Sequence, residues 1–114
     1  MAWWATELKR GEIWWVDLDP TRGGEIQKTR PAVILTVDAL NRARRTVVVV
    51  PLSTSATPRP AIVTSVPSVG AGSVAVCDQV RAVDKTRLVR RICLLSEQDL
   101  LALASGVQQV LGLA

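Results

Sequence analysis

Two short, almost uninterrupted runs of apolar, largely β-branched residues constrain the fold of this chain most. They are PAVILTV at residues 31–37 and TVVVVPL at residues 46–52. Both are shorter than a typical helix, and neither alternates with polar residues as a strand with one wet face does. Runs of this kind are typical of strands that are covered on both faces. The sequence therefore predicts a sheet whose central strands are buried.

Shorter segments extend this sheet. EIWWVDL at residues 12–18 is rich in strand formers and ends at a DP turn, and it predicts a first strand. Further strands are predicted at residues 61–66, 73–83 and 88–95, with a turn or one short helix at residues 38–45. Trp14 and Trp15 point to opposite faces of the first strand, so at least one of them is expected to reach a surface or an interface.

The last segment has a different periodicity. SEQDLLALASGVQQVLG at residues 96–112 predicts one amphipathic helix, with Ser96 as N-cap and Gly112 as its stop. Gly106 inside it costs about 1 kcal/mol relative to alanine, so packing on the sheet must hold the helix. The predicted class is mainly β (α+β), a small, bent antiparallel sheet or barrel capped by this helix.

The length of 114 residues predicts a single domain over residues 1–114. Within it, residues 1–10 are expected to form an N-terminal arm that carries Trp3 and Trp4, either ordered or bound to a partner. The apolar patch at residues 1–11 is too short for a signal peptide, and no stretch approaches the roughly 20 apolar residues of a membrane span. A soluble, cytoplasmic protein without membrane contact is expected.

The residue types that are missing exclude whole classes of mechanism. The chain has no His, Tyr or Phe, so it has no histidine base, histidine metal ligand or tyrosine nucleophile. Cys77 and Cys93 lie far apart without a CxxC pair, which argues against a zinc site and predicts buried, reduced thiols. No metal site and no cofactor are predicted.

The formal net charge of +4 points weakly to a polyanionic partner. Five bases lie between Arg81 and Arg91 against the single acid Asp84, and a second basic cluster is formed by Arg42, Arg44 and Arg45. Binding to a phosphate backbone and simple solvation both remain open for these clusters.

A basic protein without histidine can still cleave RNA, because the 2′-hydroxyl of the substrate is the nucleophile. The protein must align that hydroxyl, supply positive charge to the phosphorane oxygens and assist proton transfer. Arginine suits the second task because its planar fork binds phosphate bidentately. Glu25 or Asp78 is then the natural base, and Ser53 or Thr54 can donate a hydrogen bond to the phosphate.

Three segments carry a resemblance to a known family. In chain order they are RGEIWWVDLDPTRGGEIQKTRPAVIL at residues 10–35, TVVVVPLSTS at 46–55 and SVAVCDQVRAVDKTRL at 73–88. Together they resemble the MazF/PemK family over about residues 10–112. The resemblance implies an SH3-like antiparallel barrel of the CcdB/PemK type with a C-terminal helix.

The resemblance also implies a function. Members are toxins of type II toxin-antitoxin systems, dimeric mRNA interferases that cut single-stranded RNA without metal and leave a 2′,3′-cyclic phosphate and a 5′-hydroxyl. The implied partners are single-stranded RNA, a second copy of the chain and a MazE-like antitoxin whose acidic tail folds over the RNA groove.

Carried over by position, the resemblance implies a set of site residues. The catalytic residues are Arg30 of the RP dipeptide, Ser53 at the end of the third strand and Glu25 in the first loop, with the base open between Glu25 and Asp78. The RNA-binding residues are Lys28, Thr54, Asp78, Gln79 and Arg81. Gly24 and Val76 stand where the branch that includes Kid has a histidine and an arginine, so that branch's division of acid and base roles does not carry over.

Each assignment has a structural alternative. Arg30 can pair with Asp17 or Asp19, Ser53 can satisfy backbone groups at a strand end, and Arg87 is expected to be an ion-pair partner. At the level of function, the alternatives are a non-catalytic CcdB-like toxin that binds a protein such as DNA gyrase and an inactive relative that serves as a repressor or antitoxin sink.

Overall fold

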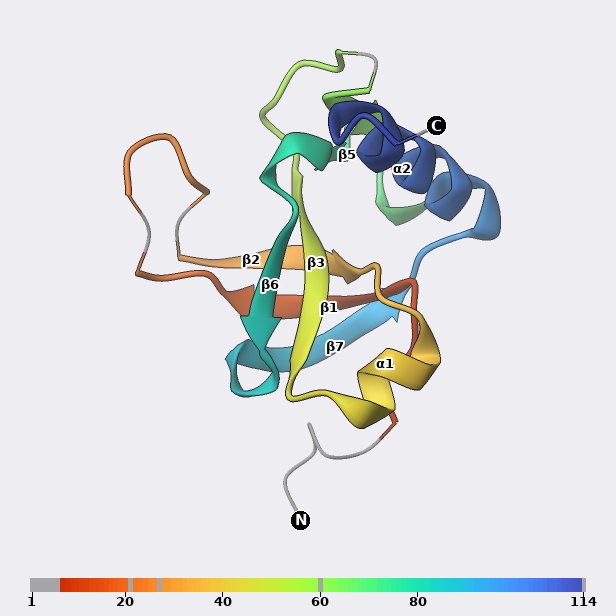
Figure 1. The fold of residues 1–114 in the computed structure, drawn as a ribbon. Helices are drawn as coiled ribbons and strands as arrows, with labels where there is room; N and C mark the ends of the chain where they lie inside the picture. The colour runs from red at the N-terminus through yellow and green to blue at the C-terminus, as the bar shows by residue number, and fades with distance from the viewer. Residues whose placement is uncertain (1–6, 21, 27, 60, 114) are drawn as a thin grey trace.

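Seven strands form one antiparallel sheet among the residues that the computed structural model describes, which are 7–20, 22–26, 28–59 and 61–113. The strands are β1 (Glu12–Asp17), β2 (Thr29–Ile34), β3 (Thr46–Ser53), β4 (Val63–Ser65), β5 (Val74–Val76), β6 (Arg81–Asp84) and β7 (Leu88–Leu94). Their order is β4, β5, β3, β2, β1, β7, with β6 also paired to β3 (Figure 1). The mainly β class is confirmed, while Trp3 and Trp4 of the expected arm lie outside the described residues.

Strand β3 organises the sheet because it pairs with three neighbours. Its first half pairs with β6 from Thr46↔Asp84 to Val49↔Arg81, and its last two residues pair with β5. Its other edge pairs with β2. Because β3 is shared between β6 and β5 along one edge, the sheet changes neighbours halfway along it. No pairing joins the end strands β4 and β7 within the described ranges, so closure of the expected sheet or barrel is not detected there.

The prediction of one continuous strand at residues 73–83 is wrong for the middle of that segment. It divides into β5 and β6 around a 3₁₀ turn, η3 (Cys77–Gln79), closed by the Val80 N–H, which donates to the Cys77 carbonyl at 3.4 Å. Asp78 and Gln79 are poor strand formers, and a turn here lets β5 and β6 bond to different parts of β3. The turn also places Asp78 and Gln79 beside the loop between β1 and β2.

The central strands are covered on both faces, as the apolar runs predicted. Neighbouring residues of one strand fall into different clusters of buried side chains, with Trp14 in one and Ile13 in the other. Val49 and Val50 of β3 divide in the same way. Trp14 is buried and Trp15 half-buried, as expected of two neighbouring residues on opposite faces of a strand.

The predicted C-terminal helix is α2 (Glu97–Val110), which lies over one end of the sheet (Figure 1). The Ser96 hydroxyl accepts from the Asp99 N–H at 3.1 Å, which confirms the N-cap. A Cβ at Gly106 would lie 2.8 Å from Cys77 Sγ and 2.9 Å from Thr64 Oγ1. The interior glycine that weakens the helix therefore permits its close packing on β4 and η3.

The segment at residues 38–45 contains one short helix, α1 (Asp38–Ala43), which connects β2 to β3 (Figure 1). Neither it nor any other helix of the described chain is long and apolar enough to cross a membrane.

Candidate functional site

A hollow of about 560 Å³, lined by both polar and apolar side chains, opens where β2 begins and β3 ends. We call it the Arg30 hollow. Its polar groups include the Arg30 guanidinium and the hydroxyls of Ser53 and Thr54, and its apolar wall includes Trp15 and Ile26. A cation and hydroxyls beside apolar side chains suit a ligand that combines a phosphate with a flat base.

The strand register explains why Arg30 and Ser53 meet. The β2–β3 ladder runs from Ile34↔Val49 to Ala32↔Pro51. Continued by two residues, the same antiparallel register places Arg30 opposite Ser53, on the same face of the two strands. The ladder stops short of this pair next to Pro51, which has no N–H to donate. The two side chains therefore stand at the open end of a rigid strand pair.

The Ser53 hydroxyl is oriented by the turn that follows it. Ser53 Oγ accepts from the Ser55 N–H at 3.1 Å and lies 3.2 Å from Ser55 Oγ. A hydroxyl that accepts a backbone N–H can still donate its own proton, here either to Ser55 Oγ or to a ligand. Ser53 is half-buried and Thr54 is exposed, so both can meet a ligand in the hollow.

A second hollow, of about 520 Å³, lies on the other side of Ile26. We call it the Gln79 hollow. Its polar lining comes from the β1–β2 loop and from η3 and β6, and consists of Glu25, Asp78, Gln79 and Arg81. Ile26 is the residue that the two linings share, so it lies between the two hollows.

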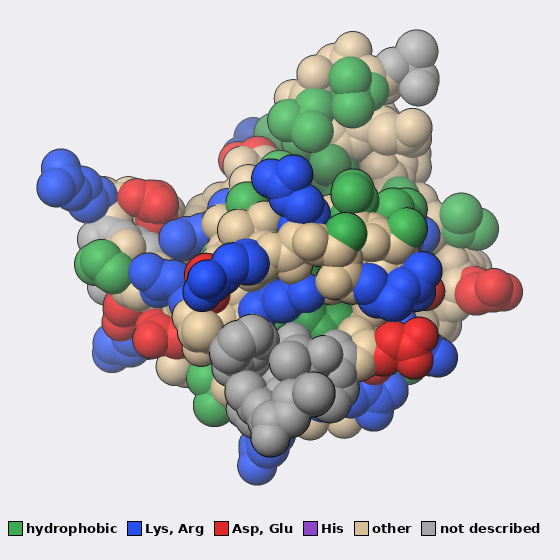
Figure 2. Space-filling model, turned by 60° about the horizontal axis from the view of Figure 1, so that its bottom comes forward, with side chains coloured by type: hydrophobic (Ala, Val, Ile, Leu, Met, Phe, Trp, Pro, Cys, Tyr) green, Lys and Arg blue, Asp and Glu red, His purple; other side chains and the backbone are tan. Residues whose placement is uncertain are grey.

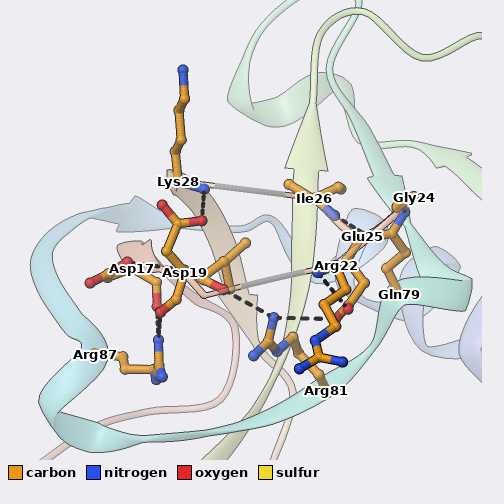
Figure 3. A network of polar contacts seen from close by, with 11 residues as sticks. Asp17, Asp19, Arg22, Gly24, Glu25, Ile26, Lys28, Gln79, Arg81 and Arg87 are labelled. Atoms are coloured by element: carbon orange, nitrogen blue, oxygen red, sulfur yellow. Dashed lines mark hydrogen bonds and ion pairs between the residues drawn. The ribbon is translucent and has the colours of Figure 1, made fainter.

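Most polar side chains near the Gln79 hollow are bonded to the β1–β2 loop (Figure 3). Gln79 Oε1 accepts from the Ile26 N–H at 2.8 Å, and Gln79 Nε2 donates to the Gly24 carbonyl at 3.3 Å. Arg81 Nη1 donates to the Leu18 carbonyl at 3.3 Å and lies 4.0 Å from Glu25 Oε2. The groups of this hollow therefore hold the loop.

Arg87 contributes to the same network through carbonyls. Its Nη1 donates to the carbonyls of Asp17 and Asp19, and no ion pair of the described residues includes it, so the expected ion-pair role is wrong. Asp84 begins the short turn η4 (Lys85–Arg87) by accepting from the Thr86 N–H and hydroxyl at 2.9 and 2.8 Å. These two bonds hold the pKa of the Asp84 carboxyl below its ordinary value, and the charges of Arg45 and Arg87 act in the same direction.

The eight predicted site residues thus fall into three groups. Arg30, Ser53 and Thr54 line the Arg30 hollow, Glu25, Asp78, Gln79 and Arg81 line the Gln79 hollow, and Lys28 lines neither. The Lys28 N–H donates to Asp19 Oδ1 at 2.7 Å, and its side chain extends away from the loop (Figure 3). Neither candidate base, Glu25 or Asp78, lies in the same hollow as Arg30.

Ile26 was missed by the sequence analysis. It is a single apolar residue inside the polar stretch GGEIQKTRP, and that contrast was the available signal. Trp15, one of the two indoles of which at least one was expected to reach a surface or an interface, lines the Arg30 hollow beside it.

The basic clusters are mostly occupied in structural contacts. Arg91 Nε lies 2.9 Å from Glu12 Oε2, and Lys85 is buried. Arg42 lies 3.9 Å from Glu7. Figure 2, in which the bottom of the view in Figure 1 is turned forward, shows Lys and Arg in several separate groups with acidic and apolar side chains between them. Arg44 and Arg45 follow α1 and precede Thr46, so β3, at roughly 3.3 Å per residue, places them more than about 20 Å from Ser53.

The cysteines are free, as expected. Cys77 is buried beneath α2, and burial raises the pKa of its thiol against the smaller opposing effect of its contact with Thr64. A buried thiol with a raised pKa stays protonated at neutral pH and is not a nucleophile. Cys93 is half-buried in the wall of the Arg30 hollow. Within the described part of the chain, no three His, Cys, Asp or Glu side chains group so as to hold a metal.

Comparison with known proteins finds one matching family model and several relatives of this chain. Residues 9–111 match the family model described as PemK-like, MazF-like toxin of type II toxin-antitoxin system. Endoribonuclease PemK of Escherichia coli is 45% identical over 83 residues, which cover 69% of this chain and 62% of that protein. Endoribonuclease MazF of Staphylococcus epidermidis is 30% identical over 112 residues, 93% of this chain and 92% of that protein.

Solved structures share the fold. Form-I of MazF from Deinococcus radiodurans superposes with a TM-score of 0.84 at 22% identity, covering 95% of this chain and 99% of that chain. An endoribonuclease in complex with its cognate antitoxin from a mycobacterial species superposes with a TM-score of 0.75 at 22% identity, covering 96% and 97%. At this identity the likeness concerns the fold alone.

Proposed function

Because the chain belongs to the family of PemK-like, MazF-like toxins of type II toxin-antitoxin systems, we propose that it is an endoribonuclease that cleaves single-stranded RNA without a metal ion. The observation that carries the proposal is the Arg30 hollow. There Arg30 and Ser53, which the continued β2–β3 register places opposite each other, line one hollow together with Trp15 and Ile26.

In the proposed reaction, the 2′-hydroxyl of the RNA attacks the adjacent phosphorus. The bond from the 2′ oxygen to phosphorus forms and the bond from phosphorus to the 5′ oxygen breaks. The proton lost by the 2′-hydroxyl is balanced by the one that the 5′ oxygen gains. The products are a 2′,3′-cyclic phosphate and a 5′-hydroxyl.

Arg30 supplies the positive charge in this scheme. Its fork stabilises the charge that develops on the phosphorane oxygens, in a hollow partly shielded by apolar side chains. The Ser53 hydroxyl donates to the same phosphate, and Thr54 beside it binds the flanking backbone. Trp15 offers a face on which a neighbouring base stacks.

Two further roles extend along the RNA. Lys28 contacts a backbone phosphate, since it is exposed and its side chain extends away from the loop (Figure 3). Asp78 and Arg81 border the Gln79 hollow, where a nucleotide next to the cleaved bond would lie. Glu25 remains a candidate base only if the substrate spans both hollows.

We also propose that the chain forms a homodimer and binds a MazE-like antitoxin. Mycobacterial and Deinococcus radiodurans relatives were solved in complex with their antitoxins. β7 stands at the end of the strand order and exposes Val89 and Leu94, which gives a second copy an apolar edge to cover. Sedimentation of the purified protein measures the dimer directly.

The test of the proposed function is digestion of a long, defined RNA in the presence of a chelator, with mapping of both new ends. We expect cleavage at a small set of sequences, with cyclic phosphate and 5′-hydroxyl ends, by the native protein and not by Arg30→Ala. Arg44→Ala is the matched control, because it removes an exposed arginine more than about 20 Å from Ser53. Toxicity without any RNA cleavage would instead support a protein-binding toxin.

A further inference from the structure

The amide of Gln79 bonds to two backbone groups of the β1–β2 loop, far away in the sequence. Its oxygen accepts from the Ile26 N–H at 2.8 Å and its nitrogen donates to the Gly24 carbonyl at 3.3 Å. Only this orientation of the amide pairs a donor with an acceptor at both ends. We call residues 22–26 the tip of this loop. Gln79 therefore holds the tip through both the oxygen and the nitrogen of its side-chain amide (Figure 3).

The neck of the loop, formed by residues 17–19 and by Lys28, is held by different hydrogen bonds. The Leu18 N–H donates to the Lys28 carbonyl at 3.0 Å, and the Lys28 N–H donates to Asp19 Oδ1 at 2.7 Å. Arg87 adds its bonds to the carbonyls of Asp17 and Asp19. None of these contacts involves Gln79, so its removal releases the tip and leaves the neck closed.

The other polar contact that the described residues make between the tip and the sheet is weak. Glu25 lies 4.0 Å from Arg81, and its side chain is 54% exposed, so this ion pair is screened by water. The Arg22 N–H donates to Glu25 Oε1 at 2.9 Å, but this bond is internal to the tip. Among the described residues, the two bonds of Gln79 are therefore the main polar connection between the tip and the sheet, and they act beside the packing of the Ile26 side chain against the cluster that contains Trp14.

The tip carries Ile26, the residue that lies between the two hollows. Since the group that Gln79 holds most closely is the N–H of Ile26 itself, a change at Gln79 moves this wall of the Arg30 hollow. A displacement of about 1 Å at a reacting centre can cost about a hundredfold in rate.

We propose that Gln79 is a positioning residue for RNA cleavage: it fixes Ile26 against the Arg30 hollow and acts through the loop, without reading the RNA. The proposal rests on the proposed function. It replaces the RNA contact that the sequence suggested for Gln79 with a contact to the protein's own backbone.

The first test measures the loop without reference to activity. Amide hydrogen exchange, followed by NMR on the full chain, is compared for native protein, Gln79→Ala and Gln79→Glu. We expect the Ile26 amide to exchange about tenfold faster in Gln79→Ala, as loss of one net hydrogen bond predicts, while the Leu18 and Lys28 amides keep their rates. Gln79→Glu retains an oxygen acceptor and is expected to keep Ile26 protected.

The second test measures cleavage of one defined RNA. For Gln79→Ala we expect kcat to fall about ten- to hundredfold, with KM changed less than about threefold and the same sequences cut. Gln108→Ala is the matched control, because it removes an exposed glutamine from α2.

Three outcomes would overturn the proposal. They are an unchanged Ile26 exchange rate in Gln79→Ala, a changed set of cleaved sequences, or a rise in KM with kcat unaltered. The last two would make Gln79 an RNA contact. If the native protein cleaves no RNA, the proposed function fails, and the exchange rate of Ile26 still decides whether Gln79 holds the loop.

Discussion

The Arg30 hollow and the Gln79 hollow have similar volumes, share Ile26 as a wall and contain similar kinds of polar residue, but they use them differently. In the Gln79 hollow the amide and the guanidinium bond to the loop backbone, across more than 50 residues of sequence. In the Arg30 hollow the hydroxyls bond within a single turn. The first arrangement fixes a loop, whereas the second orients the Ser53 hydroxyl in the lining of the Arg30 hollow.

Replacement of Arg30 tests this contrast with the largest expected effect. Arg30→Ala removes the charge that stabilises the phosphorane, and cleavage is expected to fall about a thousandfold. Arg30→Lys should recover only part of that loss, because an ammonium cannot bind two phosphate oxygens in one plane. Both rates are measured on one defined RNA. Thermal unfolding serves as the control, and undiminished cleavage by Arg30→Ala would remove Arg30 from the mechanism.

Ser53→Ala is expected to have the next largest effect. It removes one hydrogen bond to a charged phosphate, which corresponds to about ten- to hundredfold in kcat/KM. Because Ser53 also accepts from the Ser55 N–H, Ser53→Thr is the matched variant that keeps the hydroxyl. If Ser53→Thr is as inactive as Ser53→Ala, the shape of the turn matters and the hydroxyl does not.

Ile26→Ala joins the two hollows. We expect cleavage to fall about tenfold, because the wall beside Arg30 is withdrawn, and the free energy of unfolding to fall by about 1 to 2 kcal/mol for a half-buried side chain. Ile62→Ala is the control, since Ile62 is 38% exposed and lines neither hollow. Equal losses of cleavage in the two variants would show that Ile26 acts through stability alone.

Glu25→Gln is expected to have the smallest effect. Its carboxylate is exposed and 4.0 Å from Arg81, and glutamine keeps an oxygen for the Arg22 N–H. Cleavage should change less than about threefold, and the free energy of unfolding by less than about 1 kcal/mol. The pH profile of kcat/KM provides the decisive readout. A loss as large as that of Arg30→Ala would make Glu25 the general base and the two hollows one site.

The strands, the C-terminal helix and its cap followed from local patterns, because apolar periodicity and capping residues act within a few positions. The ordered motifs around RP and PLSTS also indicated Arg30 and Ser53 as site residues, and the structure places both in the lining of one hollow.

The division between the two hollows could not be predicted in this way. It depends on Ile26, whose position is set by a hydrogen bond to Gln79, 53 residues away. Arg87 shows the same limit, since sequence patterns suggest carboxylate partners for an arginine, whereas its acceptors are main-chain carbonyls that every residue carries. The break in the strand at residues 73–83 likewise follows from β3 having two neighbours on one edge.

The close packing of α2 on η3 has a practical consequence. The Cys77 sulfur is fully buried, and the missing Cβ of Gly106 lets the helix lie directly on it. An alkylating reagent can therefore reach Cys77 only in molecules whose terminal helix has lifted, while the half-buried Cys93 is closer to solvent. Because the pKa of the Cys77 thiol is raised by burial, the docked form is also chemically unreactive. The rate of labelling at Cys77 relative to that at Cys93 therefore reports how often α2 detaches from the sheet.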